Sequence, residues 1–189
     1  MNGPQSIRLP IRFARFASSR RGGATVEFVI VFPMFLLLFL VCFETSMLFT
    51  RQLMLERALD LTMRDVRLST GETFPAVILR RSICERALIL PACDDSLALE
   101  ITRVDRSTYA TPSSAAACVD RGDGAEAPDT IQDGSPDEMM LVRACFTVAP
   151  FFPTIGLGLE LVRDTNGEMQ LTTASAFVQE PGTGSGGGS

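Results

Sequence analysis

The sequence predicts an α+β protein in which a long N-terminal transmembrane helix continues into a small head stapled by disulfides. The head is predicted to hold a second helix and a three- or four-stranded antiparallel sheet. Three observations lead to this fold: residues 28–43 carry no charge and are mostly apolar, helix-spaced apolar residues follow as far as residue 68, and three later segments alternate apolar with polar residues.

The apolar run is long enough to span a bilayer. A hydrocarbon core of about 30 Å needs about 20 helical residues, and residues 28–50 supply that length with one carboxylate near the far end. A cleaved secretory signal is the alternative, but such a signal has only about 7 to 15 apolar residues and ends in small ones. Because this segment ends in Phe43, Glu44 and Met47, we predict one transmembrane helix, with its membrane half in residues 23–50.

Arginines orient this helix. Five arginines and no acidic residue precede the apolar run, whereas from Gln52 onward 11 arginines are outnumbered by 20 acidic residues. The positive-inside rule therefore places the N-terminus in the cytoplasm and most of the chain outside it. Without residues 1–22 the chain would keep 12 basic and 22 acidic residues, a balance that argues against nucleic acid as a partner.

Two residues interrupt the apolar character of the span. Glu44 lies 17 residues beyond Glu27, which is about 25 Å along a helix. We therefore interpret Glu44 as an interfacial or snorkelling carboxylate in preference to a contact with a specific partner. Pro33 removes one backbone hydrogen bond and predicts a kink near the helix start, although neighbouring side chains can satisfy the freed carbonyl.

The helix is predicted to continue beyond the membrane through residues 51–68, with an apolar stripe that seats the head. The stripe consists of Met54, Leu55, Ala58, Leu61, Thr62 and Val66. Together the two halves predict one helix from about residue 25 to residue 68, because Ser69, Thr70 and Gly71 end the pattern.

The head is predicted to occupy residues 69–181. Its second helix covers residues 75–90 and stops at Pro91. Strands are predicted at residues 97–104, 140–148 and 169–178, with an Asn166-Gly167 turn before the last of them. Residues 107–138, rich in Pro, Gly, Ala and Asp, predict a long exposed loop whose acids are solvated, and residues 182–189 have linker composition.

Four cysteines follow the membrane segment and predict disulfides. Cys42 lies inside the segment as a small apolar filler, whereas Cys84, Cys93, Cys118 and Cys145 lie on the oxidising side. Four cysteines allow three pairings, and sequence alone does not choose among them. We favour Cys84 with Cys93 and Cys118 with Cys145, because these bonds close two local loops in a small domain. Zinc is disfavoured, because neither pair has C-x2-C spacing and the chain has no histidine.

The composition gives little indication of a catalytic site. The chain has no histidine, one tyrosine and no phosphate-loop motif, so an enzyme would need an Asp/Glu dyad that only the fold could assemble. The Arg121-Gly122-Asp123 tripeptide arises easily by chance and does not predict host adhesion. We therefore predict no enzyme activity, no metal and no cofactor.

A known motif lies at the start of the apolar run, where residues 20–33 read RRGGATVEFVIVFP. Gly22 followed by GATVEF is similar to the prepilin-peptidase signature of type IV pilin-like proteins, in which cleavage follows a glycine and a glutamate is the fifth mature residue. With Gly23 as the first mature residue, Glu27 takes that position. Together with the ending ASAFVQEP, the pattern resembles the TadE-like minor pseudopilins of the tight adherence (Flp/Tad) pilus system. The middle of the chain is not covered.

The resemblance implies a minor pilin-like subunit with residues 1–22 as a cytoplasmic leader. It implies that Glu27 pairs with the amino terminus of a neighbouring subunit, and we place Phe28, Pro33 and Glu44 at the membrane-helix interface. The implied partners are the major pilin and other pilin-like subunits, the prepilin peptidase and the inner-membrane assembly platform. The implied location is the bacterial inner membrane with a periplasmic head, followed by incorporation into the pilus.

A second interpretation of the motif stays open. Glu27 can mark the interfacial end of a signal anchor, and Gly22-Gly23 can be only a turn. The chain would then be an uncleaved, membrane-tethered binding or scaffold domain outside the cytoplasm. Processing separates the two interpretations, because only the pilin-like subunit loses its N-terminus.

Overall fold

The computed structural model describes residues 23–68, 74–108, 116–121, 128–132, 134–135, 137–160 and 166–179. Two compact units divide the chain, Met1–Val41 and Cys42–Ser189. Helix α2, Gly23–Leu68, begins in the first unit and ends in the second. The predicted helix of residues 25–68 is therefore present, two residues longer at its start.

In the first unit, α2 carries exposed apolar side chains. Residues Val26, Phe28, Val29 and Ile30 are each more than half exposed. Of the described helices, α2 is the one that is long and apolar enough to cross a membrane. Exposure of this kind is unfavourable in water but favourable in a hydrocarbon core, so α2 is suited to anchor the chain in a membrane.

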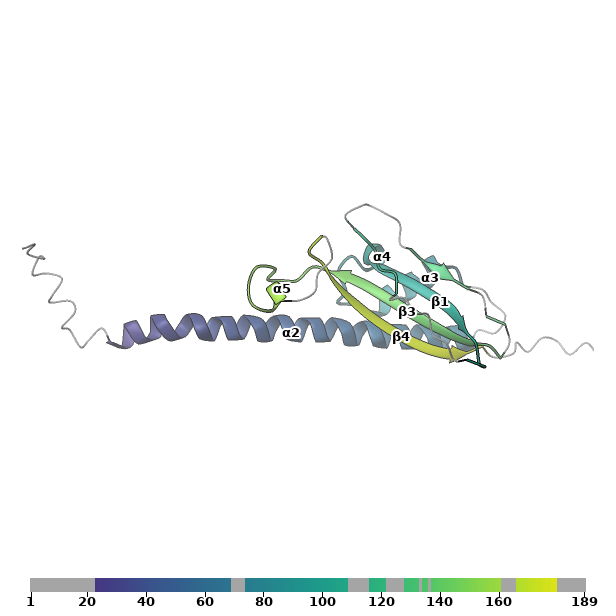
Figure 1. The fold of residues 1–189 in the computed structure, drawn as a ribbon, viewed down its shortest axis with the longest axis horizontal. Coiled ribbons are helices and arrows are strands. Elements are labelled where there is room, and N and C mark those ends of the chain that lie inside the picture. The colour runs from purple at the N-terminus through teal and green to yellow at the C-terminus, as the bar shows by residue number, and fades with distance from the viewer. Residues whose placement is uncertain are drawn as a thin grey trace, which may run out of the picture. The chain divides into compact units, whose positions relative to one another are not determined.

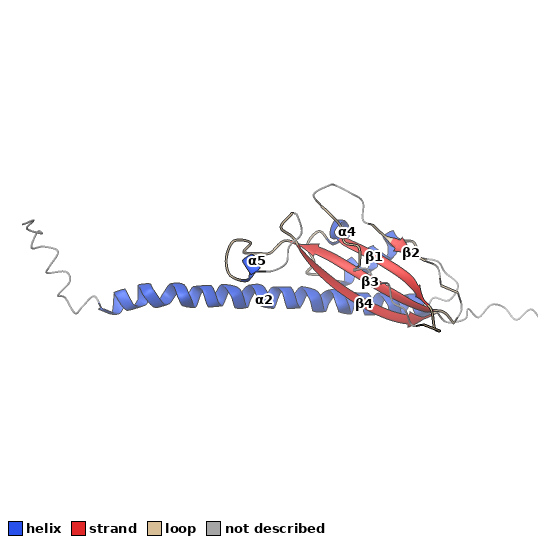
Figure 2. Ribbon diagram, viewed as in Figure 1, coloured by secondary structure: helices blue, strands red, loops and turns tan. Residues whose placement is uncertain are grey.

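The second unit contains a four-stranded sheet with strand order β2-β1-β3-β4 (Figures 1 and 2). Strands β1 (Leu97–Val104), β3 (Met139–Val148) and β4 (Met169–Val178) pair antiparallel. They match the three predicted strands to within one residue. Their alternation of apolar and polar residues fits a sheet with one face on a core.

The sheet is mixed, which corrects the prediction of a purely antiparallel one. The fourth strand, β2 (Thr130–Ile131), pairs parallel to β1. A parallel neighbour needs a long connection that returns to the same end of the sheet, and residues 105–129 supply it. A two-residue strand within a polar loop has no alternation to detect, so no sequence pattern predicted it.

The core lies between the sheet and the second half of α2. Leu55, Leu59 and Met63 of α2 join a buried cluster with Leu99 of β1 and Phe146 of β3. These helix positions recur every four residues, which places them on one face. Figure 1 shows this part of α2 running behind the strands.

Helix α3, Ala76–Arg86, ends four residues earlier than predicted. Ala87 leaves helical geometry, and the Leu90 amide donates to the Ala87 carbonyl to form a turn. A proline disfavours helical geometry in the residue directly before it, here Leu90, so Pro91 alone does not account for the end of α3 at Arg86. Helix α4, Cys93–Ser96, follows directly.

Two disulfides hold the head. Cys84 bonds to Cys93, and Cys118 bonds to Cys145 of β3; this is the pairing that the sequence favoured. The first bond joins α3 to α4, and the second ties the long loop to the sheet. The turn at Asn166-Gly167 precedes β4, and Gly167 has a φ of 77°, although β3 and β4 are joined by a longer segment that includes α5 (Leu157–Glu160).

Candidate functional site

Gly23 is the first residue of α2, whereas Gly22 lies outside the described residues. A Cβ added to Gly23 would meet no atom within 4 Å. Packing within the described chain therefore does not require a glycine at this position. A reason for glycine must be sought in backbone freedom or in recognition by another protein.

Glu27 projects from the first turns of α2 among exposed apolar residues. It makes no hydrogen bond or ion pair to any residue that the structure describes. Phe28 stacks on Phe32 with ring centroids 5.0 Å apart. The helix continues through Pro33, and the kink at Pro33 stays a prediction. A lone carboxylate on an apolar helix is costly in lipid unless a cation neutralises it.

Glu44 is buried by the chain itself. Its side chain is 1% exposed, and Oε1 accepts a hydrogen bond from the Phe152 amide at 3.3 Å. Phe43 makes edge contacts with the rings of Phe151 and Phe152, at centroid distances of 5.8 and 6.4 Å. The sequence suggested an interfacial or snorkelling carboxylate, but the structure places Glu44 beneath the segment that follows β3.

Arg51 is a second buried charge on α2, seven residues after Glu44, and sequence reasoning did not single it out. It is 6% exposed, and its guanidinium carbon lies 4.6 Å from the centroid of the Phe151 ring. Its Nε and Nη1 atoms are buried without a hydrogen bond. The aromatic face supplies part of the stabilisation that water would give. The only sequence signal was the seven-residue spacing of two charges on one helix face.

A comparison with protein families finds a match in this part of the chain. Residues 22–64 match the family model of TadE-like proteins. This segment is similar to TadE-like proteins. The match includes Gly22, Gly23, Glu27 and both buried charges, and it ends within α2. No curated protein and no solved structure matches the chain.

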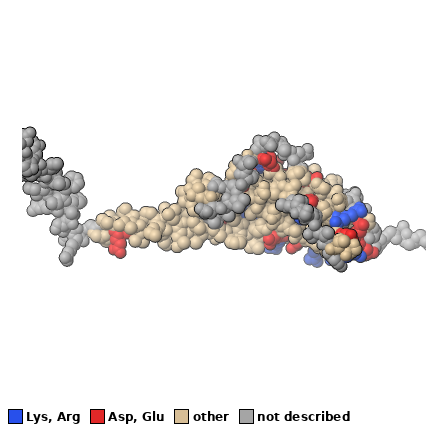
Figure 3. Space-filling view, in the orientation of Figure 1, with Lys and Arg blue, Asp and Glu red and all other residues tan. Residues whose placement is uncertain are grey.

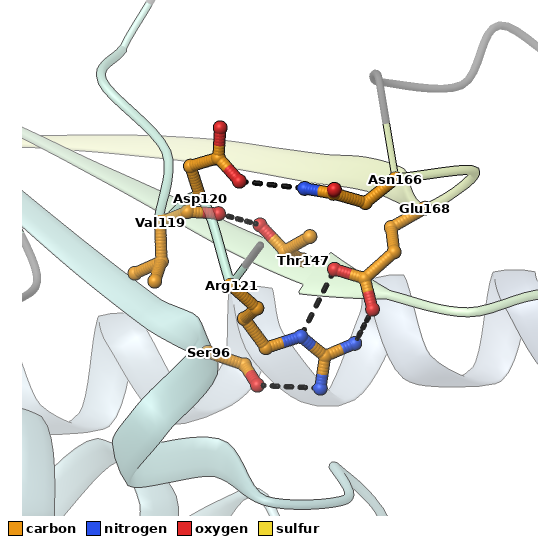
Figure 4. A network of polar contacts seen from close by, with 7 residues as sticks. All are labelled: Ser96, Val119, Asp120, Arg121, Thr147, Asn166 and Glu168. Atoms are coloured by element: carbon orange, nitrogen blue, oxygen red, sulfur yellow. Dashed lines mark hydrogen bonds and ion pairs between the residues drawn. The ribbon is translucent and has the colours of Figure 1, made fainter. Parts of the chain in front are cut away.

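The family match does not include the sheet, α3 or the loops of the head. The head carries polar clusters that are structural. In Figure 4, Arg121 donates from Nε to Glu168 at 2.9 Å and from Nη1 to Ser96 at 3.3 Å, and its Nη2 also contacts Glu168. The arginine of the Arg-Gly-Asp tripeptide is thus engaged within the head.

Neighbouring residues of the same loop are also bound to the sheet region. The Thr147 hydroxyl donates to the Val119 carbonyl at 3.1 Å, and the Asn166 amide nitrogen donates to Asp120 at 2.6 Å (Figure 4). With Cys118 in its disulfide, residues 118–121 are each attached by at least one contact. Asp120 is exposed, as the sequence predicted, and it is also hydrogen-bonded to Asn166.

Two more ion pairs join elements of the head. Asp129 pairs with Arg80 of α3 and accepts from the Leu99 amide of β1 at 2.9 Å. Arg143 of β3 pairs with Glu100, its direct neighbour on β1, at 2.6 Å. These side chains are at most 18% exposed, so both pairs are shielded from water. Removing one partner of such a pair costs more stability than removing one partner of a surface pair.

A local polar contact lies at the beginning of the loop after β1. Asp105 accepts hydrogen bonds from both the backbone amide and the hydroxyl of Ser107, each at 2.8 Å. These bonds stabilise the charged form and lower the pKa of the Asp105 carboxyl. Among the described residues, no group of three or more His, Cys, Asp or Glu side chains is placed to hold a metal.

Proposed function

We propose that this protein is a minor pilin-like subunit, a pseudopilin, that takes part in the assembly, initiation or capping of a tight adherence pilus. One observation carries the proposal: the TadE-like match spans Gly22, Gly23 and Glu27. These are the positions that a prepilin peptidase and a pilin-type assembly contact would use. A bulky α+β head suits a low-copy subunit better than a subunit that repeats along a filament.

Cleavage between Gly22 and Gly23 would remove residues 1–22. A membrane protease must draw its substrate out of helical geometry, and two glycines give the backbone that freedom. The open space around the Gly23 Cβ position supports this role, because the packing of α2 gives no other reason for glycine there. The mature protein would then begin with the ammonium group of Gly23.

Glu27 would pair with such an ammonium on a neighbouring subunit. The exposed carboxylate has no partner within the described chain, and a cation would neutralise it in a low dielectric. Phe28 and the other exposed apolar residues of the first unit would pack on sister helices. The contact would set the register between subunits, with the major pilin and other pilin-like subunits as partners.

The proposed subunit starts in the inner membrane with its head in the periplasm and is delivered to the pilus by the assembly platform. Its disulfides fit an oxidising compartment. No enzyme activity is needed for this role. A head bound to the membrane by an uncleaved helix is the alternative, and the processing of the N-terminus separates the two.

The decisive experiment is the intact mass of the membrane-extracted protein with and without a co-expressed tight adherence prepilin peptidase. We expect loss of residues 1–22 only with the active peptidase, and reduced processing of Gly22→Ala. The Glu27→Ala variant should be cleaved normally yet fail to enter pili. An unchanged mass with active peptidase would favour the tethered domain, and normal pili with Glu27→Ala would refute the register role of Glu27.

A further inference from the structure

Residues 149–159, termed here the α5 loop, form an uncharged segment with apolar side chains on its surface. No charged residue occurs between Arg143 and Glu160. Phe151, Ile155 and Leu159 are 45%, 42% and 58% exposed. In Figure 3 the described surface around α5 is tan, and the blue and red atoms of the head gather elsewhere. A connecting loop that faces water is normally polar, so this apolar surface needs a partner.

The α5 loop lies against α2 where the membrane span is predicted to end. It contacts Phe43 through two rings, Glu44 through the Phe152 amide and Arg51 through the Phe151 ring. The charge-free run of α2 ends at residue 43, and a span that starts at residue 28 reaches its full length at about residue 48. The contacts therefore coincide with the outer boundary of the bilayer.

We propose that the α5 loop is a second membrane contact of this protein, which inserts Phe151, Ile155 and Leu159 into the outer interface of a phospholipid bilayer. We infer that lipid covers this surface, because the loop packs on α2 at the level where the predicted membrane span ends. Aromatic and aliphatic side chains suit the boundary between headgroups and acyl chains.

The loop also removes two charges from that boundary. Glu44 and Arg51 would otherwise lie beside the lipid, where an ionised side chain is costly. The Phe152 amide binds the carboxylate of Glu44, and the Phe151 ring covers the guanidinium of Arg51. The exposed side chains of Phe151, Ile155 and Leu159 beside them are apolar. This arrangement does not depend on cleavage after Gly22, so its test is independent of the proposed pilin role.

The test uses the full-length chain, one molecule per lipid nanodisc, with a nitroxide spin label on a single introduced cysteine. Cys42 is the free cysteine and is first replaced in a Cys42→Ala background. The label is placed at Ile155→Cys or, in a second protein, at Leu159→Cys. Power-saturation measurements then compare collisions with oxygen, which concentrates in lipid, and with a nickel chelate, which stays in water.

Val77→Cys is the matched control. Val77 is an apolar residue of α3 that is 61% exposed, close to the 58% of Leu159. Leu79 of α3 and Phe74 just before it line one cavity together with Val66 of α2, so α3 lies beside Val66. Val66 is 15 residues beyond Arg51 on α2, or about 22 Å, so the control label is expected in water. Intact masses with both disulfides formed show that each variant has folded.

We expect the ratio of oxygen to nickel collisions to be severalfold higher at residues 155 and 159 than at residue 77. A raised ratio at residue 159 alone would still support the proposal, because Ile155 is the more buried of the two sites. Ratios at both sites equal to that at Val77→Cys would overturn it. The apolar surface would then have to serve a protein partner, such as the helix of a neighbouring subunit.

Discussion

At the scale of single residues, Asp129 has a role that its surroundings in the sequence conceal. It lies in a stretch of Pro, Gly, Ala and Asp, and the sequence predicted a solvated acid. The structure instead places it in contact with Arg80 of α3 and the Leu99 amide of β1, with its side chain 12% exposed. One carboxylate thus joins a helix, a strand and the edge segment that contains β2.

Asp129→Ala should lower the free energy of unfolding by about 3 kcal/mol, because it leaves the guanidinium of Arg80 buried without its counter-charge. Asp65→Ala is the control: Asp65 pairs with Arg86 but is 59% exposed, so its loss should cost less than about 1 kcal/mol. Urea unfolding of the detergent-solubilised chain, followed by circular dichroism, measures both. Equal effects for the two variants would contradict this account of Asp129.

At the scale of elements, the second half of α2 shows how far periodicity predicts packing. The sequence identified Leu55, Ala58 and Thr62 as part of a buried stripe, and all three are buried. It also included Leu61, which is 40% exposed, and it omitted Leu59 and Met63, which are buried. The stripe was found, but its centre was displaced by part of a turn, because a helix rich in apolar residues offers several similar faces.

Leu59→Ala tests which face of α2 seats the head. Leu59 is fully buried in the core, so its truncation should lower the free energy of unfolding by about 3 kcal/mol through lost transfer energy and a residual cavity. Leu53→Ala, on the same helix but 62% exposed, should change it by less than about 0.5 kcal/mol. The midpoints of urea unfolding compare the two. A larger effect of Leu53→Ala would mean that the opposite face of α2 packs on the sheet.

At the scale of the whole molecule, the compact unit that contains the head begins at Cys42 and includes the second half of α2. The head was predicted to start at residue 69, after the helix. The core cluster contains Leu55, Ala58, Leu59 and Met63 together with the sheet. Half of a long helix therefore belongs to the fold of the head, and a boundary after Leu68 would divide the core.

Two truncated chains test this boundary. A chain that begins at Cys42 should show cooperative thermal unfolding, because it keeps the helix that covers the sheet. A chain that begins at Ser69 should not, because the apolar face of β1 and β3 would be exposed to water. Circular dichroism during heating, with both disulfides formed, distinguishes them. Cooperative unfolding of the shorter chain would show that α2 is not part of the folding unit.

The sequence by itself determined the features that depend on local pattern: the long apolar helix, the limits of three strands and the family motif from Gly22 to Glu27. Length, period and residue type are properties of a short segment, so they can be read without the fold. Only the tertiary structure decided that Glu44 is buried beneath Phe152, 108 residues farther along the chain. It likewise decided that Arg51 lies against Phe151 and that Asp129 binds α3 and β1, because such contacts depend on how distant segments pack and leave no periodic signal.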